Sequence, residues 1–401
     1  MVEELQDWRW LPVWRERRLT VLLALGLVLL VGTTTWQRAL GQAETSLPAG
    51  ATYESGVVVA VLQEGTTTVG PVTQPFQRLR VRVTSGEQAG SEIEISVGVR
   101  DLNAAGLRYQ PGDRVFLSRT VGPDGRQAYF IVDRDRGTPL LVLAFLFVVA
   151  ILLLGRWKGL RALVSLALTF VVLIWVMVPR ILDGANPVAA AITSSFFVFT
   201  ATMLLTHGPG RATVAAIVGT SISLVITGAL AALFVRAAAL TGLSSEEAAF
   251  LQVVVGGEPI NPQGLLLAGM IIGALGVLDD ITVSQSSLVF ELRRANPLLS
   301  GWELFLSGVR VGRDHIAATV NTLVLAYAGV ALPLFLLFTQ LDQPLVQVVN
   351  REMVSEEIVR TLVGSLGLIS AVPLTTGFAS WLAVRTPPER LREGRHVHHH
   401  H

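Results

Sequence analysis

The sequence predicts an α-helical polytopic membrane protein of about eight transmembrane helices, with a small all-β domain inserted after the first helix. Three observations lead to this fold class. Of the 401 residues, 51% are hydrophobic and only 15% are charged, against about 25% charged in an average soluble domain. Several apolar runs are long enough to cross a bilayer as helices. Residues 52–135 differ from them, because short β-branched segments alternate there with turn residues.

The first apolar run covers residues 19 to about 36 and follows a polar, aromatic and basic start. A cleaved signal peptide is the alternative to a membrane anchor. The run is long for a signal peptide, and no clear small-residue cleavage site precedes Gln42. We therefore predict that residues 1–40 form a cytoplasmic N-terminus and the first transmembrane helix.

Residues 52–135 are expected to form a domain of five strands, at 57–62, 79–84, 93–99, 115–120 and 128–133. Turn signals such as Pro111–Gly112–Asp113 separate them. Five short strands fit an OB-like barrel, whose closure removes exposed sheet edges. Binding of single-stranded nucleic acid would need stacking aromatics in a basic groove. This segment mixes Arg with Asp and Glu and has few aromatics, so we expect a packing or docking module without a nucleic-acid partner.

The remaining chain is expected to form a seven-helix membrane domain over residues 138–384. The predicted helices cover residues 138–155, 159–179, 187–206, 211–236, 265–290, 315–339 and 361–384. Proline and glycine mark several of their ends. Two connections are longer, and the acidic one at 340–360 is a candidate amphipathic surface helix. Residues 385–401 form a tail whose last residues, His398–His401, resemble an expression tag.

Lys and Arg in the short loops predict the orientation, because cytoplasmic loops carry the excess of these residues. With the N-terminus inside, the outer short connections contain only Arg180, Arg236, Arg351 and Arg360. The inner segments contain the arginines from Arg385 onward together with Arg9, Arg15, Arg17, Arg18, Arg156, Lys158, Arg161, Arg211, Arg293, Arg294, Arg310 and Arg313. We therefore expect both termini in the cytoplasm and an extracytoplasmic β domain.

One helix, predicted over residues 265–290, carries a stripe of small and polar residues at steps of three or four: Gly269, Gly273, Gly276, Asp280, Ser284, Ser287 and Glu291. The glycines are expected to let a neighbouring helix approach closely, either within one chain or between the chains of a homo-oligomer. A carboxylate at mid-depth costs roughly 2.5–3.5 kcal/mol on insertion scales and usually faces a bundle interior or a wet cavity. Asp279 lies about 100° round the helix from Asp280. We predict that Asp280 is the buried one.

A second polar segment follows at residues 312–329. Gly312–Arg313–Asp314 is interpreted as a helix start, with Asp314 capping free N–H groups. Asn321 lies two turns further on the same face, next to Thr322. A membrane-embedded amide often bonds across to another helix, for about 0.6 kcal/mol on average. The alternative, which we favour, is that Asn321 lines a site with Asp280.

Hydroxyl groups crowd three further helices, and this enrichment favours an internal hydrated path. Each hydroxyl can instead bond a carbonyl of its own helix, so one alone carries little information. His207 is interpreted as a surface histidine at the inner membrane edge. The hydroxyl residues, with the glycines among them, are Thr193, Ser194, Ser195, Thr200, Thr202, Gly219, Thr220, Ser221, Ser223, Thr375, Thr376 and Gly377.

The sequence argues against an enzyme. It contains no Cys, which excludes disulfides, thiolate metal sites and cysteine nucleophiles. A phosphate-binding loop, an H-E-x-x-H motif and a G-x-S-x-G elbow are also missing from the sequence. A membrane aspartyl protease needs two facing carboxylates, whereas Asp280 and Asp314 are expected at different depths. We predict no catalytic residues and no cofactor apart from a bound monovalent or divalent cation.

The two polar segments resemble the YibE/YibF-like family of bacterial multipass membrane proteins. The matching residues are Gly273–Ala274–Leu275–Gly276 with Asp280 and Ser284, and Gly312–Arg313–Asp314 with Asn321–Thr322–Leu323 and Ala326–Tyr327. Similar patterns occur at Arg136, Pro139–Leu140, Gly155–Arg156, Gly159–Leu160, Asn186–Pro187, Leu243 to Glu247, Gly364 and Gly367. Asp279 stands where the family usually has an apolar residue. The resemblance implies a bacterial inner-membrane protein of a family commonly supposed to contain permeases.

We therefore expect a transporter or permease that moves a small ion or solute through a polar site centred on Asp280. Ser284, Asn321 and Thr322 are the expected neutral ligands, and Asp279, Ser287 and Asp314 are the further candidates. Desolvation favours the protonated carboxyl, which suits proton coupling, and oxygen ligands also suit a small cation. The alternative is a non-transporting scaffold whose β domain binds an envelope protein, with the polar stripe serving only as contact between helices.

Overall fold

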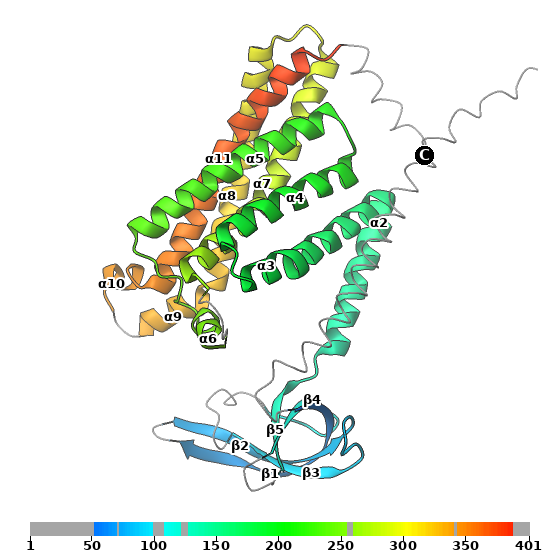
Figure 1. Ribbon diagram of the computed structural model, residues 1–401, viewed down its shortest axis with the longest axis vertical. Helices are drawn as coiled ribbons and strands as arrows, with labels where there is room; N and C mark the ends of the chain where they lie inside the picture. Colours follow the sequence, from blue (N-terminus) through cyan, green and yellow to red (C-terminus); the bar gives the residue numbers. More distant parts are fainter. Residues whose placement is uncertain are drawn as a thin grey trace, which may run out of the picture. The chain divides into compact units, whose positions relative to one another are not determined.

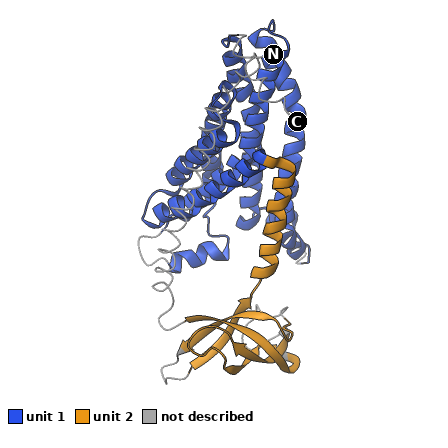
Figure 2. Cartoon of the chain, turned by 90° about the vertical axis from the view of Figure 1, so that its right-hand side faces the viewer, with its two compact units in different colours: residues 1–28, 157–401 blue, residues 29–156 orange. Residues whose placement is uncertain are grey.

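The computed structural model describes residues 52–69, 72–98, 108–121, 127–254, 260–340 and 343–387. It is mostly helical and divides into two compact units, coloured separately in Figure 2. The β unit comprises residues 29–156, and the helical unit comprises residues 1–28 and 157–401. The predictions for the first apolar run and for the tail beyond residue 387 lie outside the described residues.

The β unit contains one antiparallel sheet of five strands: β1 (Thr52–Val69), β2 (Val72–Val83), β3 (Glu92–Val97), β4 (Arg114–Val121) and β5 (Gln127–Arg134). All five predicted strands are present; β1 extends beyond both of its predicted ends, and β2 begins before its predicted start. The spatial order is β3-β2-β1-β4-β5 (Figure 1). The edge strands β3 and β5 contact each other, so the sheet is curled. Its core is formed by β-branched and large apolar residues, among them Val58, Leu79, Val81, Ile95, Val115 and Leu117.

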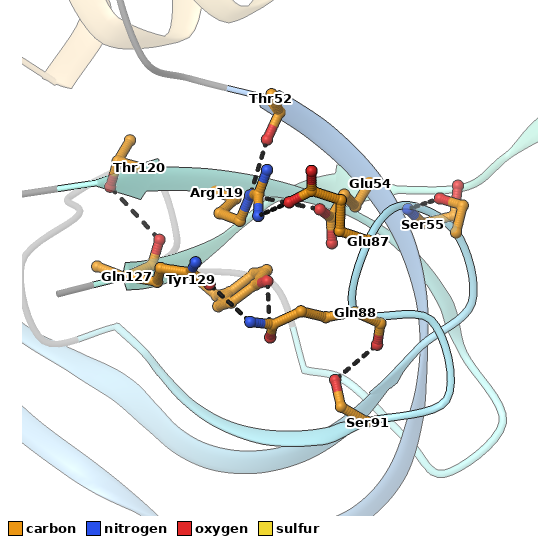
Figure 3. Close-up of polar contacts among 12 residues, drawn as sticks. Thr52, Glu54, Ser55, Glu87, Gln88, Ser91, Arg119, Thr120, Gln127 and Tyr129 are labelled. Carbon is orange, nitrogen blue, oxygen red and sulfur yellow. Dashed lines mark hydrogen bonds and ion pairs between the residues drawn. The ribbon is translucent and has the colours of Figure 1, made fainter. Parts of the chain in front are cut away.

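A network of polar side chains fixes the loop between β2 and β3 against β1 and β4 (Figure 3). The guanidinium of Arg119 lies 3.5 Å from the buried Glu54 carboxylate and 2.9 Å from that of Glu87. Gly86 has a φ of 87°, and a Cβ there would lie 2.6 Å from the Glu54 carboxylate, so this turn requires glycine. The Tyr129 hydroxyl donates to Gln88 Oε1 at 3.0 Å. Burial and the nearby Glu54 carboxylate raise the pKa of Tyr129, which keeps this hydroxyl a donor at neutral pH.

The buried side-chain amide of Gln77 binds the backbone of Tyr109 at the edge of the β-unit core. Its Oε1 accepts from the Tyr109 N–H at 2.7 Å, and its Nε2 donates to the Tyr109 carbonyl at 3.2 Å. Gln77→Met should therefore leave two buried backbone groups unpaired, at roughly 1–3 kcal/mol each. We expect faster amide hydrogen exchange across β2 and β4 in the intact protein. Gln63→Met is the control, because Gln63 is exposed; equal protection in both variants would contradict the assigned role of Gln77.

The helical elements follow the sheet in chain order: α2 (Gly137–Val172), η2 (Leu173–Met177), α3 (Val178–Leu182), α4 (Pro187–His207), α5 (Arg211–Ala237), α6 (Glu246–Val254), α7 (Pro262–Ala295), α8 (Gly301–Val330), α9 (Leu332–Gln340), α10 (Leu345–Val349) and α11 (Glu352–Val384). Arg156 interrupts α2 with a φ of 47°, between the two helices predicted there. Among the described residues, five helices are long and apolar enough to cross a membrane. A sixth is added if α8 and α9, bent by 56°, form one span.

The prediction that a helix begins at Gly312–Arg313–Asp314 is wrong. Helix α8 begins eleven residues earlier (312 − 301), where Ser300 and Glu303 form a capping box: the Ser300 N–H donates to Glu303 Oε2 at 2.8 Å, and the Glu303 N–H donates to Ser300 Oγ at 3.3 Å. Asp314 is an exposed residue within the helix. Gly312 is a packing position, because a Cβ there would lie 2.5 Å from Val372 Cγ1.

Helices α5, α7 and α11 pack side by side at the centre of the helical unit (Figure 1). Small residues bring their backbones together: Gly219 lies against Thr375, and Gly367 against Thr227.

Buried polar contacts also join these helices. Thr220 and Thr282 share a hydrogen bond of 2.5 Å, Thr376 Oγ1 donates to Gln285 Oε1 at 3.0 Å, and Ser286 Oγ donates to the Ala212 carbonyl at 2.6 Å. Of the hydroxyls predicted to line a hydrated path in α5 and α11, Thr220 and Thr376 thus join helices, and Ser221 Oγ donates to the Ile217 carbonyl of its own helix. Ser223 Oγ and Thr375 Oγ1 are buried and have no hydrogen-bond partner among the described residues.

Candidate functional site

The predicted stripe lies on the outer surface of α7. Gly269, Gly273, Gly276, Asp280, Ser284 and Ser287 are all exposed, and Asp279 is half-buried. The prediction that Asp280 is the buried carboxylate is therefore wrong. The opposite face of α7 is buried because it carries the large apolar residues, including Ile271, Leu278 and Ile281. Burial of these side chains contributes more free energy than close approach at the glycines.

The predicted helix contact at the three glycines does not occur within the described chain. A Cβ at Gly269 or Gly276 would meet no described atom within 4 Å, and one at Gly273 would meet only the Tyr327 hydroxyl, at 3.5 Å. The alternative, in which these glycines pack against a second copy of the chain, stays a prediction.

The predicted ligands are not gathered around Asp280. Ser284 Oγ donates to the Asp280 backbone carbonyl at 2.8 Å, and Thr322 Oγ1 donates to the Ala318 carbonyl at 3.0 Å. Asn321, Ser287 and Asp314 are exposed. Within the described ranges, no hydrogen bond joins any of these side chains to the Asp280 carboxylate. The α8 residues therefore do not complete a site with α7.

A cavity of about 500 Å³ lies beside the two aspartates, along the side of α7 that carries Ile272, Gly276 and Val283. Both Asp279 and Asp280 line it, together with residues of α2, η2 and α4. Its other polar lining residues are Ser165, Thr169, Ser195, Thr202, Thr206 and His207, and the rest are small or apolar. Among the described residues, neither Lys nor Arg lines the cavity. The two carboxylates therefore share a cavity with hydroxyl groups of α2 and α4 in place of the predicted α8 residues.

Local capping fixes the two helices that carry most of this lining. The Asn186 side chain accepts from the Val188 and Ala189 N–H groups at 2.9 and 3.2 Å, and so begins α4. The Asn261 side chain accepts from the Gly264 N–H at 3.0 Å and begins α7, ahead of Pro262. Helix α4 ends at Gly208, whose φ of 76° stops it just after His207.

Three threonines of the cavity use their protons on their own helices. Thr169 Oγ1 donates to the Ser165 carbonyl at 2.9 Å, Thr202 Oγ1 to the Phe199 carbonyl at 3.0 Å, and Thr206 Oγ1 to the Thr202 carbonyl at 2.6 Å. A hydroxyl has one proton and two lone pairs, so these oxygens can only accept further hydrogen bonds. Ionised carboxylates also only accept. The cavity is therefore rich in acceptors and suits a cation or a proton donor.

The protonation of His207 follows from the same bonds. Its Nδ1 lies 2.8 Å from Thr206 Oγ1. Because Thr206 donates its proton to Thr202, neutral His207 must carry its own proton on Nδ1 and donate it to Thr206. Its Nε2 is then an acceptor, which adds a titratable acceptor at the cavity rim. The interpretation of His207 as a surface histidine agrees with its exposure, but the residue also lines the cavity.

Two buried serines remain available to a ligand. Ser165 Oγ and Ser195 Oγ have no hydrogen-bond partner in the part of the chain that the structure describes. Buried hydroxyls normally have a partner, so such groups in a cavity wall indicate an ordered water or an ion. Ser195 and Thr202 belong to the hydroxyl-rich helix noted in the sequence, whereas Ser165, Thr169 and Thr206 were missed. Helical spacing was the available signal, because Ser165 and Thr169 lie four residues apart and Thr202 and Thr206 likewise.

The described residues do not form a metal site with three acidic or imidazole ligands. No three of their His, Asp and Glu side chains come close enough to hold a metal ion together. The cavity can therefore offer a cation two carboxylates and neutral oxygens, without a cage of three acidic or imidazole ligands.

Comparison with known families gives one match. The model of the family described as YibE/F-like protein matches residues 143–385, more than half of the chain. This range includes every residue that lines the cavity. Neither the curated proteins nor the solved structures contain a match to the chain.

Proposed function

The chain belongs to the YibE/F-like protein family, and from this premise we propose that it is a transporter or permease of a bacterial cytoplasmic membrane. Its cargo or coupling ion is a proton or a small cation. The observation that carries the proposal is the acceptor-rich cavity beside Asp279 and Asp280, within a unit of long apolar helices. Carboxylates at membrane depth are typical of ion and proton pathways.

The proposed membrane arrangement has eight spans. The segment from Gly137 to Leu182 has 46 residues, about 69 Å at 1.5 Å per residue, whereas a bilayer core is about 30 Å thick. The break at Arg156 divides it into two spans. With α4, α5, α7, the α8–α9 pair, α11 and the first apolar run, this gives eight. Both termini are then cytoplasmic and the β unit is extracytoplasmic. Its strand order and the contact of β3 with β5 support the OB-like interpretation.

The proposed chemistry uses the two neighbouring carboxylates as one binding unit. When both are ionised they repel each other, and a bound proton or cation relieves this repulsion. Ser165 and Ser195 can turn their free hydroxyls toward a cation as it loses water, and the threonine oxygens accept from its remaining hydration shell. Reversible occupation of such a site is what transport requires.

The scaffold alternative interprets the polar stripe of α7 as contact between helices. Contacts of that kind lie elsewhere in the helical unit, at Thr220–Thr282 and Thr376–Gln285. The stripe is exposed and borders the cavity through Gly276 and Asp280. These positions favour transport over the scaffold.

The proposal is tested by thermal unfolding of the purified protein in a panel of lithium, sodium, potassium, magnesium and calcium chlorides at several pH values. One of these cations, or protons, should stabilise the protein, by about 2.7 kcal/mol when its concentration is one hundred times Kd. The double variant Asp279→Asn/Asp280→Asn should lose this stabilisation. Asp183→Asn, at an exposed acid outside the cavity, should keep it. Stabilisation that persists in the double variant, or none in the protein itself, would refute the proposal.

A further inference from the structure

A second cavity, of about 460 Å³, lies against the N-terminal part of α7 and the first turns of α11. Its polar lining consists of Ser244, Ser245, Glu356, Glu357 and Arg360. The larger part of its wall is apolar and includes Leu265, Leu266, Val330, Pro333, Leu334 and Met353. None of these residues lines the cavity at Asp279 and Asp280.

The charges at this cavity are unequally paired. Arg360 Nη1 donates to Glu357 Oε1 at 2.6 Å, so the guanidinium neutralises Glu357. Glu352 lies nearby and accepts from the Thr241 hydroxyl at 2.7 Å and from the Gly242 N–H at 3.0 Å. Arg360 also attracts the Glu356 carboxylate, but within the described residues its salt bridge is to Glu357 and not to Glu356. The four side chains together leave an excess of negative charge.

Glu356 is the group that needs a partner. It is only 7% exposed, and its Oε1 has neither a hydrogen-bond partner among the described residues nor contact with solvent. Ser244, which lines the same cavity, is the hydroxyl nearest in effect to this carboxyl. A buried carboxylate that must share a cation with a second carboxylate is costly, and such a group in a cavity wall indicates a missing ion or ligand.

The size and lining of the cavity select the ligand. Cavities of 300–1,000 Å³ with apolar walls and a few polar groups are typical of small-molecule sites, and a bare ion would fill little of this volume. We propose that this cavity binds a protonated organic amine. Its ammonium group pairs with Glu356 and bonds Ser244, and its hydrocarbon part lies against Leu265, Leu334 and Met353. This site is separate from the proposed transport site and does not depend on it.

The probe is n-hexylammonium chloride, added to the full chain in detergent, with binding measured by calorimetry and thermal unfolding. Sodium chloride at equal ionic strength and 1-hexanol are the comparisons. We expect hexylammonium to bind and to stabilise the protein more than either. Glu356→Gln should weaken this binding at least tenfold, about 1.4 kcal/mol. Glu247→Gln, at an exposed acid of α6 outside the cavity wall, should leave it unchanged.

A second variant keeps the carboxylate and fills the apolar part of the cavity, in case Glu356→Gln does not fold. Met353→Trp should weaken hexylammonium binding and spare that of methylammonium. Three results would overturn the proposal: sodium or hexanol stabilising the protein as well as hexylammonium, unchanged hexylammonium binding in folded Glu356→Gln, or equal binding of both amines in Met353→Trp and in the original protein.

Discussion

Asp279→Asn is expected to reduce cation or proton flux through the reconstituted protein to the background of empty liposomes, and Asp280→Asn to reduce it less. Both carboxylates line the cavity, but Asp279 is half-buried and Asp280 is exposed. A more enclosed carboxylate has less water to replace a bound ion, so its charge contributes more to binding. Asparagine keeps the shape of the side chain and removes the charge. The measurement is uptake into proteoliposomes of the ion that stabilises the protein.

The control for this experiment is Asp183→Asn, which changes an exposed carboxylate outside the cavity wall and should transport normally. Thermal unfolding of all three variants separates loss of transport from loss of folding. Normal flux in Asp279→Asn would contradict the proposed transport site. Loss of flux in Asp280→Asn alone would return the principal role to Asp280, as the sequence first suggested.

The helices and strands were predictable because each depends on local patterns. Apolar length predicted the helices, β-branched alternation predicted the strands, and proline and glycine correctly marked the start of α4 at Pro187 and its end at Gly208. At the start of α8 a local signal had been passed over: Ser300 and Glu303 stand at capping-box spacing, and the helix begins at Gly301, eleven residues before the predicted start at Gly312. That spacing is visible in the sequence and predicts the observed start of α8.

The candidate site was predictable only in part, because a helical stripe does not say which face meets which neighbour. Periodicity placed Asp280 with Gly276 and Ser284, which the structure confirms as one face of α7. It could not decide whether that face or the face of Leu278 and Ile281 would be buried. The choice of α4 over α8 as the partner depends on tertiary packing, and no spacing in the sequence encodes it. Hence the carboxylates were found and their ligands were not.

Gly367→Ala is expected to be the most destabilising of the single-methyl changes proposed for the core of the helical unit. The added Cβ would lie 3.1 Å from Thr227 Cβ and 3.2 Å from its Cγ2. Thr227 cannot move aside easily, because it is fully buried and donates to the Ser223 carbonyl at 2.7 Å. Overpacking of this kind costs about 1–3 kcal/mol, which exceeds the gain of up to about 1 kcal/mol from alanine in a helix.

Gly364→Ala provides the matched comparison, since it lies one turn away on the same helix and a Cβ there would meet no described atom within 4 Å. We expect Gly364→Ala to leave the unfolding temperature unchanged or slightly raised, and Gly367→Ala to lower it. Removing the opposing atoms with Thr227→Ala should restore part of the loss in the double variant, as a coupled pair requires. Similar unfolding temperatures for Gly364→Ala and Gly367→Ala would mean that α5 and α11 do not pack through Gly367. In that case α7, which packs against α5 and α11, would be placed differently, and the cavity that Asp279 lines on its other side would lose its structural basis.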